Sequence, residues 1–138
     1  MGKDTVINCD LSPRRNLRIL VVDDEKDIGL VLKRELEDHG FEADAYHEPE
    51  SALMNFSAGS YDLVITDIKM PKMNGFELFR EIRKIDSRVK VCFLTAFEIY
   101  HEEFKKMFPS TEVNHFIKKP ISICDLLKII ESEVIEGS

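Results

Sequence analysis

The feature that most constrains this chain is a strict alternation of short apolar runs with segments of helical period. Runs at 17–22, 61–66, 89–95 and 113–118, and a weaker one at about 41–47, predict five strands. After each run, apolar residues recur three and four positions apart, at 28–36, 52–56, 78–85, 97–108 and 123–134, which predicts five helices. Such alternation predicts an α/β protein with one parallel sheet and helices on both faces.

The helical stripes also predict which side chains enter the core. The expected core residues are Ile28, Val31, Leu32 and Leu36 on the first helix and Leu78, Phe79, Ile82 and Ile85 on the third. The length of 138 residues suits a single domain with a well-buried core. Residues 1–16 are polar and aperiodic, so we expect a flexible tail there and a folded domain over 17–138. Proline and glycine in the stretch 69–75 predict a loop.

Composition restricts the function classes open to the chain. The formal net charge of −7 argues against nucleic-acid binding by this domain, because polyanion binding needs a basic patch. No apolar run approaches the roughly 20 residues of a membrane span, and no signal-peptide core is present at the N-terminus. Cys9, Cys92 and Cys124 are too scattered for a disulfide framework. We therefore expect a cytoplasmic protein that makes no contact with membranes.

Polar side chains collect where the predicted strands end. These are Asp23 and Asp24 after the first strand, Asp67 after the third, Thr95 at the end of the fourth, and Lys118 and Lys119 before Pro120. In an open parallel sheet, ligands bind at the carboxyl ends of the strands, near the point where the strand order reverses. Three acids, a hydroxyl and a cation are thus expected at one edge of the sheet.

These residues stand in motifs that resemble the response-regulator receiver family, which includes the bacterial chemotaxis regulator. The matching pieces are VVDD at 21–24, DIKMPKMNG at 67–75, TA at 95–96 and KP at 119–120. The D-x-x-M-P-x-x-x-G run is specific, and all four pieces occur in the family's order. The resemblance implies a flavodoxin-like, doubly wound sheet of five parallel strands in the order 2-1-3-4-5, with five helices. It covers about residues 17–135.

The resemblance also implies a phosphorylation switch. Asp67 would accept a phosphoryl group from a sensor histidine kinase or a phosphotransfer protein. Asp23, Asp24 and Asp67, with the backbone carbonyl of Lys69, would hold Mg²⁺. Elementary electrostatics agrees, because clustered carboxylates repel and the pKa of at least one would rise without a cation that prefers oxygen ligands. The domain would then be no enzyme beyond its own phosphorylation and dephosphorylation.

The same family likeness assigns the response to phosphorylation. Thr95 would contact the phosphoryl group, and Lys119, the residue before a proline bond that is often cis in the family, would neutralise it. Phosphorylation adds roughly −1.5 to −2 charge. As Thr95 moves toward that charge, the switch aromatic Phe116 would swing inward and change the surface made by the fourth helix, fifth strand and fifth helix.

Three isoleucines on that surface motivate a hypothesis about partners. Ile99 lies off the stripe of the fourth helix, and Ile129 and Ile135 lie off the core stripe of the last. Scattered exposed apolar residues are normal, but the family uses this face for partners or dimers. A dimer through this face is therefore a hypothesis, and the downstream target stays unknown.

Each site residue has a structural interpretation when it is taken alone. Asp23 or Asp24 could cap the following helix, and Asp67 could begin a loop. Thr95 is a residue type frequent in strands, and a lone aromatic such as Phe116 is usually core. Both lysines could be solvated. The functional interpretation depends on their collection at one sheet edge with the family's spacing.

Three rival functions use the same fold class. A phosphatase of the haloacid dehalogenase type needs a D-x-D motif after its first strand, whereas Asp23 and Asp24 are adjacent. A flavodoxin-like or nucleotide-binding protein needs a glycine-rich phosphate loop there. The third rival is a receiver-like module that is never phosphorylated, and the intact acid, threonine and lysine set argues against it. No output segment follows in this sequence, which leaves a stand-alone regulator and part of a longer protein both open.

Overall fold

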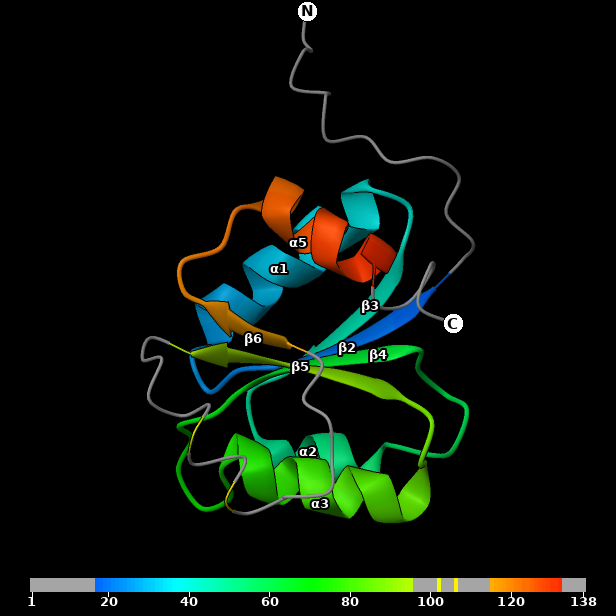
Figure 1. The fold of residues 1–138 in the computed structure, drawn as a ribbon, viewed down its shortest axis with the longest axis vertical. Helices are drawn as coiled ribbons and strands as arrows, with labels where there is room; N and C mark the ends of the chain where they lie inside the picture. The colour runs from blue at the N-terminus through cyan, green and yellow to red at the C-terminus, as the bar shows by residue number, and fades with distance from the viewer. Residues whose placement is uncertain (1–16, 96–101, 103–105, 107–114, 133–138) are drawn as a thin grey trace, which may run out of the picture.

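The computed structural model describes residues 17–95, 102, 106 and 115–132, and within them five parallel strands form one sheet (Figure 1). The strands are β2 (Arg18–Val22), β3 (Glu42–Tyr46), β4 (Leu63–Asp67), β5 (Lys90–Thr95) and β6 (His115–Lys118). Their order across the sheet is β3-β2-β4-β5-β6. Counted along the chain this is 2-1-3-4-5, so the predicted fold class and strand order are confirmed.

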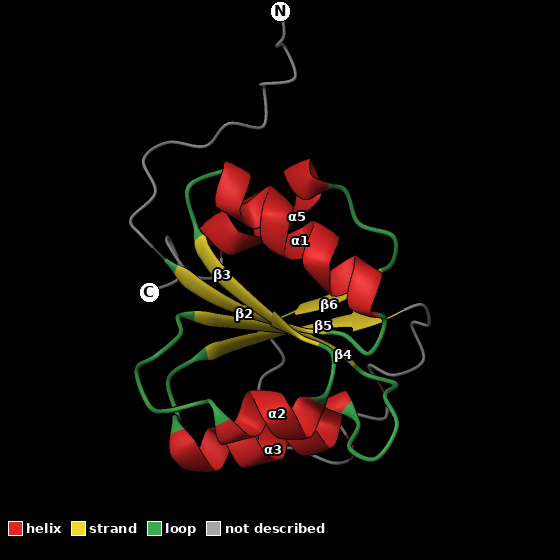
Figure 2. Cartoon of the chain, turned by 180° about the vertical axis from the view of Figure 1, so that it is seen from behind, coloured by secondary structure: helices red, strands yellow, loops and turns green. Residues whose placement is uncertain are grey.

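Helices cover both faces of this sheet. Those in the described residues are α1 (Lys26–Asp38), α2 (Pro49–Met54), α3 (Gly75–Ile85) and α5 (Ile123–Ile130). Helices α1 and α5 lie on one face and α2 and α3 on the other, which gives three layers (Figures 1 and 2). Of the helix predicted over 97–108, only residues 102 and 106 are described, and both are helical. The predicted tail at 1–16 lies outside the described residues.

The strands read as continuous apolar runs because alternate side chains enter two separate cores. In β2, Ile19 and Val21 pack under α1 and α5, whereas Leu20 and Val22 pack toward α2 and α3. The same alternation continues in β4 and β5, where Leu63, Ile65, Cys92 and Leu94 join the first core and Val64, Val91 and Phe93 join the second. Each fully buried aliphatic side chain contributes about 1.5–3 kcal/mol of transfer free energy. Cys92 is buried inside β5 as a packing residue of the first core.

The expected core was wrong at two helical positions. The side chain of Val31 is 53% exposed and that of Ile85 is 42% exposed. On α1 the buried stripe runs instead through Gly29, Leu32 and Leu36. A Cβ at Gly29 would lie at an ordinary contact distance of 3.7 Å from the Cβ of Ala45, so this face of α1 lies against β3, and Val31, two residues further along the helix, points away from it. Ile85 is the last residue of α3 and lies beyond its last buried residue, Ile82.

The start of α3 shows how local sequence sets a helix boundary. Asn74 is the N-cap, and its side chain accepts a hydrogen bond of 2.8 Å from the Glu77 backbone N–H. The Glu77 carboxylate in turn accepts a bond of 2.9 Å from the Asn74 backbone N–H. This reciprocal pair is a capping box, readable as N-x-x-E in the sequence. Gly75 is therefore the first residue of the helix, not the last residue of the predicted loop.

The end of α3 is held by the side chain of Asp86. One carboxylate oxygen accepts a hydrogen bond of 2.9 Å from Gly59 N–H, and the other accepts bonds from Arg88 N–H (2.8 Å) and Val89 N–H (3.2 Å). The Asp86→Ala variant should lower the free energy of unfolding by about 1 kcal/mol, because these backbone donors lose a charged acceptor at a solvated site. Urea unfolding measures this. The exposed Asp38→Ala variant, at the end of α1, should change stability by less than about 0.5 kcal/mol.

This contribution of Asp86 should depend on pH. The hydrogen bonds from Gly59 and Arg88 hold the pKa of the Asp86 carboxyl below its ordinary value. A carboxyl with a depressed pKa in the folded state stabilises the protein above its unfolded pKa of about 3.9, and this stabilisation is lost as the pH falls through the folded value. The stability gap between wild type and Asp86→Ala should thus shrink below about pH 4. A gap that is constant down to acid unfolding would contradict the assignment.

Candidate functional site

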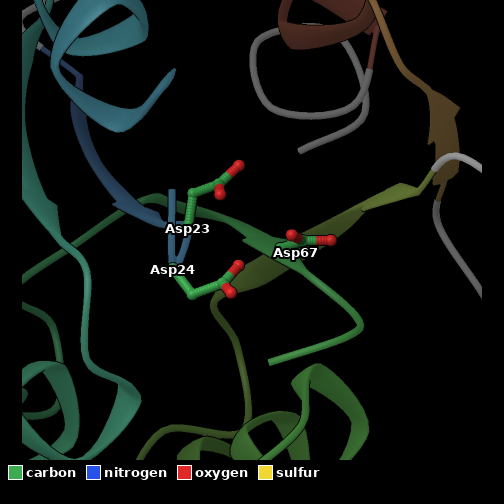
Figure 3. Close-up of side chains that lie close together, drawn as sticks. All are labelled: Asp23, Asp24 and Asp67. Atoms are coloured by element: carbon green, nitrogen blue, oxygen red, sulfur yellow. The ribbon is translucent and has the colours of Figure 1, made fainter. Parts of the chain in front are cut away.

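The order of the strands brings three aspartates together. Strand β2 lies between β3 and β4, so the strand order reverses beside it, and the carboxyl ends of β2 and β4 meet at this point. Asp23 and Asp24 follow β2, and Asp67 ends β4 (Figure 3). One carboxylate oxygen from each lies within 4.8 Å of the other two. The three acids predicted for this edge are therefore one cluster.

Asp23 is the buried member of the cluster. Its side chain is fully buried, and Oδ1 accepts a hydrogen bond of 2.8 Å from the Glu25 backbone N–H. Oδ2 lies 3.0 Å from Lys119 Nζ, but it accepts no aligned hydrogen bond from any described residue. The N-cap of α1 is Glu25, so neither Asp23 nor Asp24 caps this helix. A buried carboxylate oxygen without a hydrogen bond is costly unless a cation completes its surroundings.

Asp67 is held by its neighbour in the chain and by a distant lysine. Oδ1 accepts a hydrogen bond of 2.8 Å from Ile68 N–H, and Oδ2 accepts one of 3.1 Å from Lys119 Nζ. Burial raises the pKa of the Asp67 carboxyl above its ordinary value, and the charge of Asp23 adds to this against the opposing effect of Lys119. The Lys119 ammonium therefore offsets only part of the cost of keeping Asp67 charged at this buried position.

Lys119 supplies the positive charge beside these carboxylates. Its ammonium lies within ion-pair distance of Asp23, Asp67 and, at 3.8 Å, Glu25. Burial alone would lower the pKa of Lys119, but the nearby carboxylates of Asp23 and Asp67 raise it above its ordinary value. The backbone helps to place the side chain, because Lys119 N–H donates to Thr95 O at 2.8 Å. The Lys119–Pro120 bond is cis. Lys119 therefore stays charged beside the carboxylates, as predicted for the residue before the proline.

The other predicted site residues lie around this centre. Thr95 ends β5, is 3% exposed and follows Leu94, which pairs with Asp67 across the sheet. Phe116 on β6 is partly buried and stacks on Phe93, with ring centroids 5.3 Å apart and planes at 27°. Lys69 lies exposed in the loop after β4, and a role for its carbonyl stays a prediction.

The structure adds two residues that our sequence interpretation did not place in the site. A Cβ at Gly75 would lie 2.2 Å from the carbonyl oxygen of Asp67, so this glycine packs directly on the backbone of the acidic cluster. Gly75 also ends the D-x-x-M-P-x-x-x-G motif, but the sequence predicted it only as a residue of the loop 69–75. The second is Glu25, whose carboxylate approaches Lys119. No periodicity or spacing indicated that contact.

The hypothesis of an exposed isoleucine face is not supported at its described position. Ile129 is not among the buried residues of α5, which are Leu126, Leu127 and Ile130, but it is partly buried and packs against the core under α1 and α5, so it is not an exposed residue. The reason is that α5 packs against α1 as well as the sheet (Figure 1), which widens its buried face. Ile99 and Ile135 lie outside the described residues. A dimer through this face remains an untested prediction.

The fold and the site define a doubly wound α/β protein with clustered aspartates and a lysine at its topological switch point, and comparison with known proteins identifies the family. The model of the response regulator receiver domain family matches residues 19–131. The chain belongs to this family, the receiver domains of two-component systems. The resemblance seen in the motifs is confirmed, and membership excludes the phosphatase and flavodoxin alternatives.

Curated relatives agree with this assignment. The chain is 33% identical over 116 residues to the transcriptional regulatory protein RprY of Bacteroides fragilis, covering 84% of this chain and 48% of RprY. It is 38% identical over 112 residues to the sensor protein EvgS of Escherichia coli K12, covering 81% of this chain and 9% of EvgS. The chain spans about half the length of RprY and of the regulator YkoG from Bacillus subtilis.

Solved structures show the same fold. A response regulator receiver domain protein from Clostridium thermocellum superposes with a TM-score of 0.74 at 31% identity, covering 88% of this chain and 96% of that one. The response regulator TrrA from Thermotoga maritima, solved in complex with Mg²⁺–BeF, gives a TM-score of 0.72 at 37% identity, covering 84% and 97%. Among the described residues, no helix is both long enough and apolar enough to cross a membrane.

Proposed function

We propose that this domain accepts a phosphoryl group on Asp67 in a Mg²⁺-dependent reaction and thereby switches a partner-binding surface. The observation that carries the proposal is the position of the Asp67 carboxylate, within 4.8 Å of oxygens of Asp23 and Asp24 and 3.1 Å from the Lys119 ammonium. The domain acts as a switch and not as an enzyme on other substrates. We place it in the cytoplasm, where a sensor histidine kinase or a phosphotransfer protein would supply the phosphoryl group.

The residues present fit a magnesium ion. The donor set consists of carboxylate oxygens, which hard divalent cations prefer, and the buried Asp23 Oδ2 lacks a hydrogen bond from the described residues. The cluster holds three carboxylates, and the Lys119 ammonium pairs with two of them, Asp23 and Asp67, so the cluster retains negative charge. Asp23, Asp24 and Asp67 would hold the ion, together with the predicted Lys69 carbonyl. Bound Mg²⁺ supplies positive charge that offsets the charge of the transferred phosphoryl group.

The chain's own groups have distinct parts in the transfer. A carboxylate oxygen of Asp67 forms the new O–P bond while the bond from phosphorus to the donor breaks in line and its electron pair leaves with the donor. The Lys119 ammonium offsets the negative charge that arrives on the phosphoryl oxygens. The Thr95 hydroxyl donates a hydrogen bond to one of these oxygens, and its movement gives Phe116 room to turn inward.

Incubation with Mg²⁺ and acetyl phosphate, followed by intact mass, tests this function. We expect the wild-type protein to gain one phosphoryl group and the Asp67→Ala variant to gain none. The gain should disappear when Mg²⁺ is chelated. Gain in both proteins would mean that Asp67 is not the acceptor. No gain in either, with no binding of beryllofluoride by the folded wild type, would favour a receiver-like module that is never phosphorylated.

A protein donor would need a docking surface next to Lys119. A hollow of about 310 Å³ with mainly apolar walls lies there, lined by Val31 on α1, Leu94 at the end of β5, and Pro120 and Ile121 after β6. Because Lys119 lines this hollow as well as the site, a partner seated in it would present its phosphoryl group to Asp67. We propose that the donor protein covers the hollow with an apolar surface.

The Val31→Glu variant tests this docking surface. We expect phosphotransfer from a histidine kinase, selected by screening kinases for transfer to the wild type, to fall roughly 10-fold or more, because binding would bury an unpaired charge. Reaction with acetyl phosphate should not change. Met54→Glu is the control, since Met54 is 85% exposed on α2, on the opposite face of the sheet. Equal transfer to both variants would contradict the assignment.

A further inference from the structure

A fourth carboxylate, that of Glu25, faces the site and has no part in the transfer described above. Its Oε1 lies 3.8 Å from Lys119 Nζ, with the Glu25 side chain 64% exposed and that of Lys119 18% exposed. The Glu25 backbone is anchored on both sides, because its N–H donates to Asp23 Oδ1 and its carbonyl accepts from Ile28 and Gly29. Its side chain makes no capping hydrogen bond within the described residues. The carboxylate is thus set beside the ammonium and is not used to begin the helix.

The two other partners of the ammonium are the carboxylates that would hold the metal. Lys119 Nζ lies 3.0 Å from Asp23 Oδ2 and 3.1 Å from Asp67 Oδ2. Two cations that share the same carboxylates at such distances repel each other strongly in a site of low dielectric. The ammonium therefore competes with a divalent ion for Asp23 and Asp67. Occupation by the ion requires the ammonium to withdraw toward another negative group.

Glu25 is the group placed to receive it. We propose that Glu25 is a positioning residue, which accepts the Lys119 ammonium as Mg²⁺ occupies the aspartates and so raises the affinity of the site for Mg²⁺. The ammonium stays at the mouth of the site, where the phosphoryl group arrives. This inference rests on the proposed function. Because ion pairs with an exposed partner are weak, the expected effect on Mg²⁺ affinity is about 2- to 5-fold.

Calorimetric titration with Mg²⁺ alone, without a phosphodonor, measures this effect. Glu25→Gln should raise the Kd for Mg²⁺ about 2- to 5-fold. Asp27→Asn is the matched control: it removes the same charge from the first turn of α1, and no ion pair joins Asp27 to Lys119 within the described residues. It should raise the Kd clearly less. Equal changes in the two variants, or an unchanged Kd in Glu25→Gln, would overturn the proposal.

Two further variants separate positioning from simple charge. Glu25→Asp keeps the charge but shortens the side chain and favours helix capping, so its carboxylate should no longer reach Lys119. We expect its Kd to rise as in Glu25→Gln, and a wild-type Kd would overturn the proposal. In a Lys119→Met background, which removes the competing ammonium, Glu25→Gln should raise the Kd for Mg²⁺ no more than Asp27→Asn does. If Glu25→Gln raises the Kd by the same factor with and without Lys119, Glu25 acts without Lys119 and the proposal is wrong.

The titrations and the phosphorylation experiment fail in different ways. If the wild type gains a phosphoryl group on Asp67 but the Glu25 variants bind Mg²⁺ normally, only the role of Glu25 is wrong. If the wild type binds no Mg²⁺, both the proposed function and this inference are wrong. Since the Glu25 side chain is exposed, its variants should fold, and far-ultraviolet circular dichroism checks this.

Discussion

Replacement of Gly75 by alanine should lower the free energy of unfolding by about 2–3 kcal/mol and slow phosphorylation of Asp67. A Cβ at this position would lie 2.2 Å from the Asp67 carbonyl oxygen and 2.9 Å from the Ile68 Cα. Both are backbone atoms and cannot rotate aside as a side chain does. The loop must therefore shift, although Gly75 N–H holds it through a 2.8 Å hydrogen bond to Ile68 O. Urea unfolding and the rate of phosphoryl gain from acetyl phosphate measure the two effects.

A second glycine offers the matched control for this variant. Gly29 is buried within α1, but its Cβ would meet only the Cβ of Ala45, at an ordinary van der Waals distance of 3.7 Å. Gly29→Ala should thus stabilise the protein by about 0.5–1 kcal/mol, because alanine is the better helix former. Similar free energies of unfolding for Gly75→Ala and Gly29→Ala would contradict the close packing of Gly75 on the Asp67 backbone.

The second large effect concerns Asp23. Asp23→Asn should weaken Mg²⁺ binding roughly 10- to 100-fold or more, since loss even of a group that supports a metal ligand costs that much affinity. The amide has nearly the same shape and keeps one oxygen, but it removes a fully buried negative charge. Calorimetric titration with Mg²⁺ measures the change. Phosphorylation by acetyl phosphate should slow in parallel at low Mg²⁺.

Asp27→Asn again serves as the control, because Asp27 lies on the first turn of α1 and outside the aspartate cluster. It should leave Mg²⁺ binding within a few-fold of wild type. If Asp23→Asn binds Mg²⁺ as tightly as this control, the three aspartates do not form the metal site.

Much of the fold could be predicted from the sequence because buried parallel strands appear in it as runs of consecutive apolar residues. A parallel strand covered on both faces must be apolar at consecutive positions, and β2, β4 and β5 carry that pattern. The predicted boundaries differ from the observed ones by a few residues at most within the described segments. The weaker run at 41–47 is β3, one of the two edge strands, which alternates exposed Glu42 and Asp44 with Ala43. Its solvent-facing polar residues explain the weaker signal.

The site residues could be predicted for a related reason. A polar residue at the end of a buried parallel strand lies at the carboxyl edge of the sheet, so the sequence predicts Asp23, Asp67 and Thr95 at that edge. The choice of Lys119 over Lys118 came from the family motif, and the ion pairs to Asp23 and Asp67 agree with it. The roles of these residues in phosphoryl transfer remain proposals.

The sequence by itself determined the order of elements, the class of fold and the edge where the chemistry gathers, because local periodicity and chain connectivity allow few arrangements. Only the tertiary structure decided which apolar residues turn outward, as Val31 does when Gly29 packs on β3. It also decided that Gly75 supports the Asp67 backbone and that Glu25 meets Lys119. These contacts join segments far apart in the chain or depend on how closely two backbones approach. A pattern of residue types does not encode the distance from Gly75 to the Asp67 backbone or from Glu25 to Lys119, because both distances are set when the layers pack together.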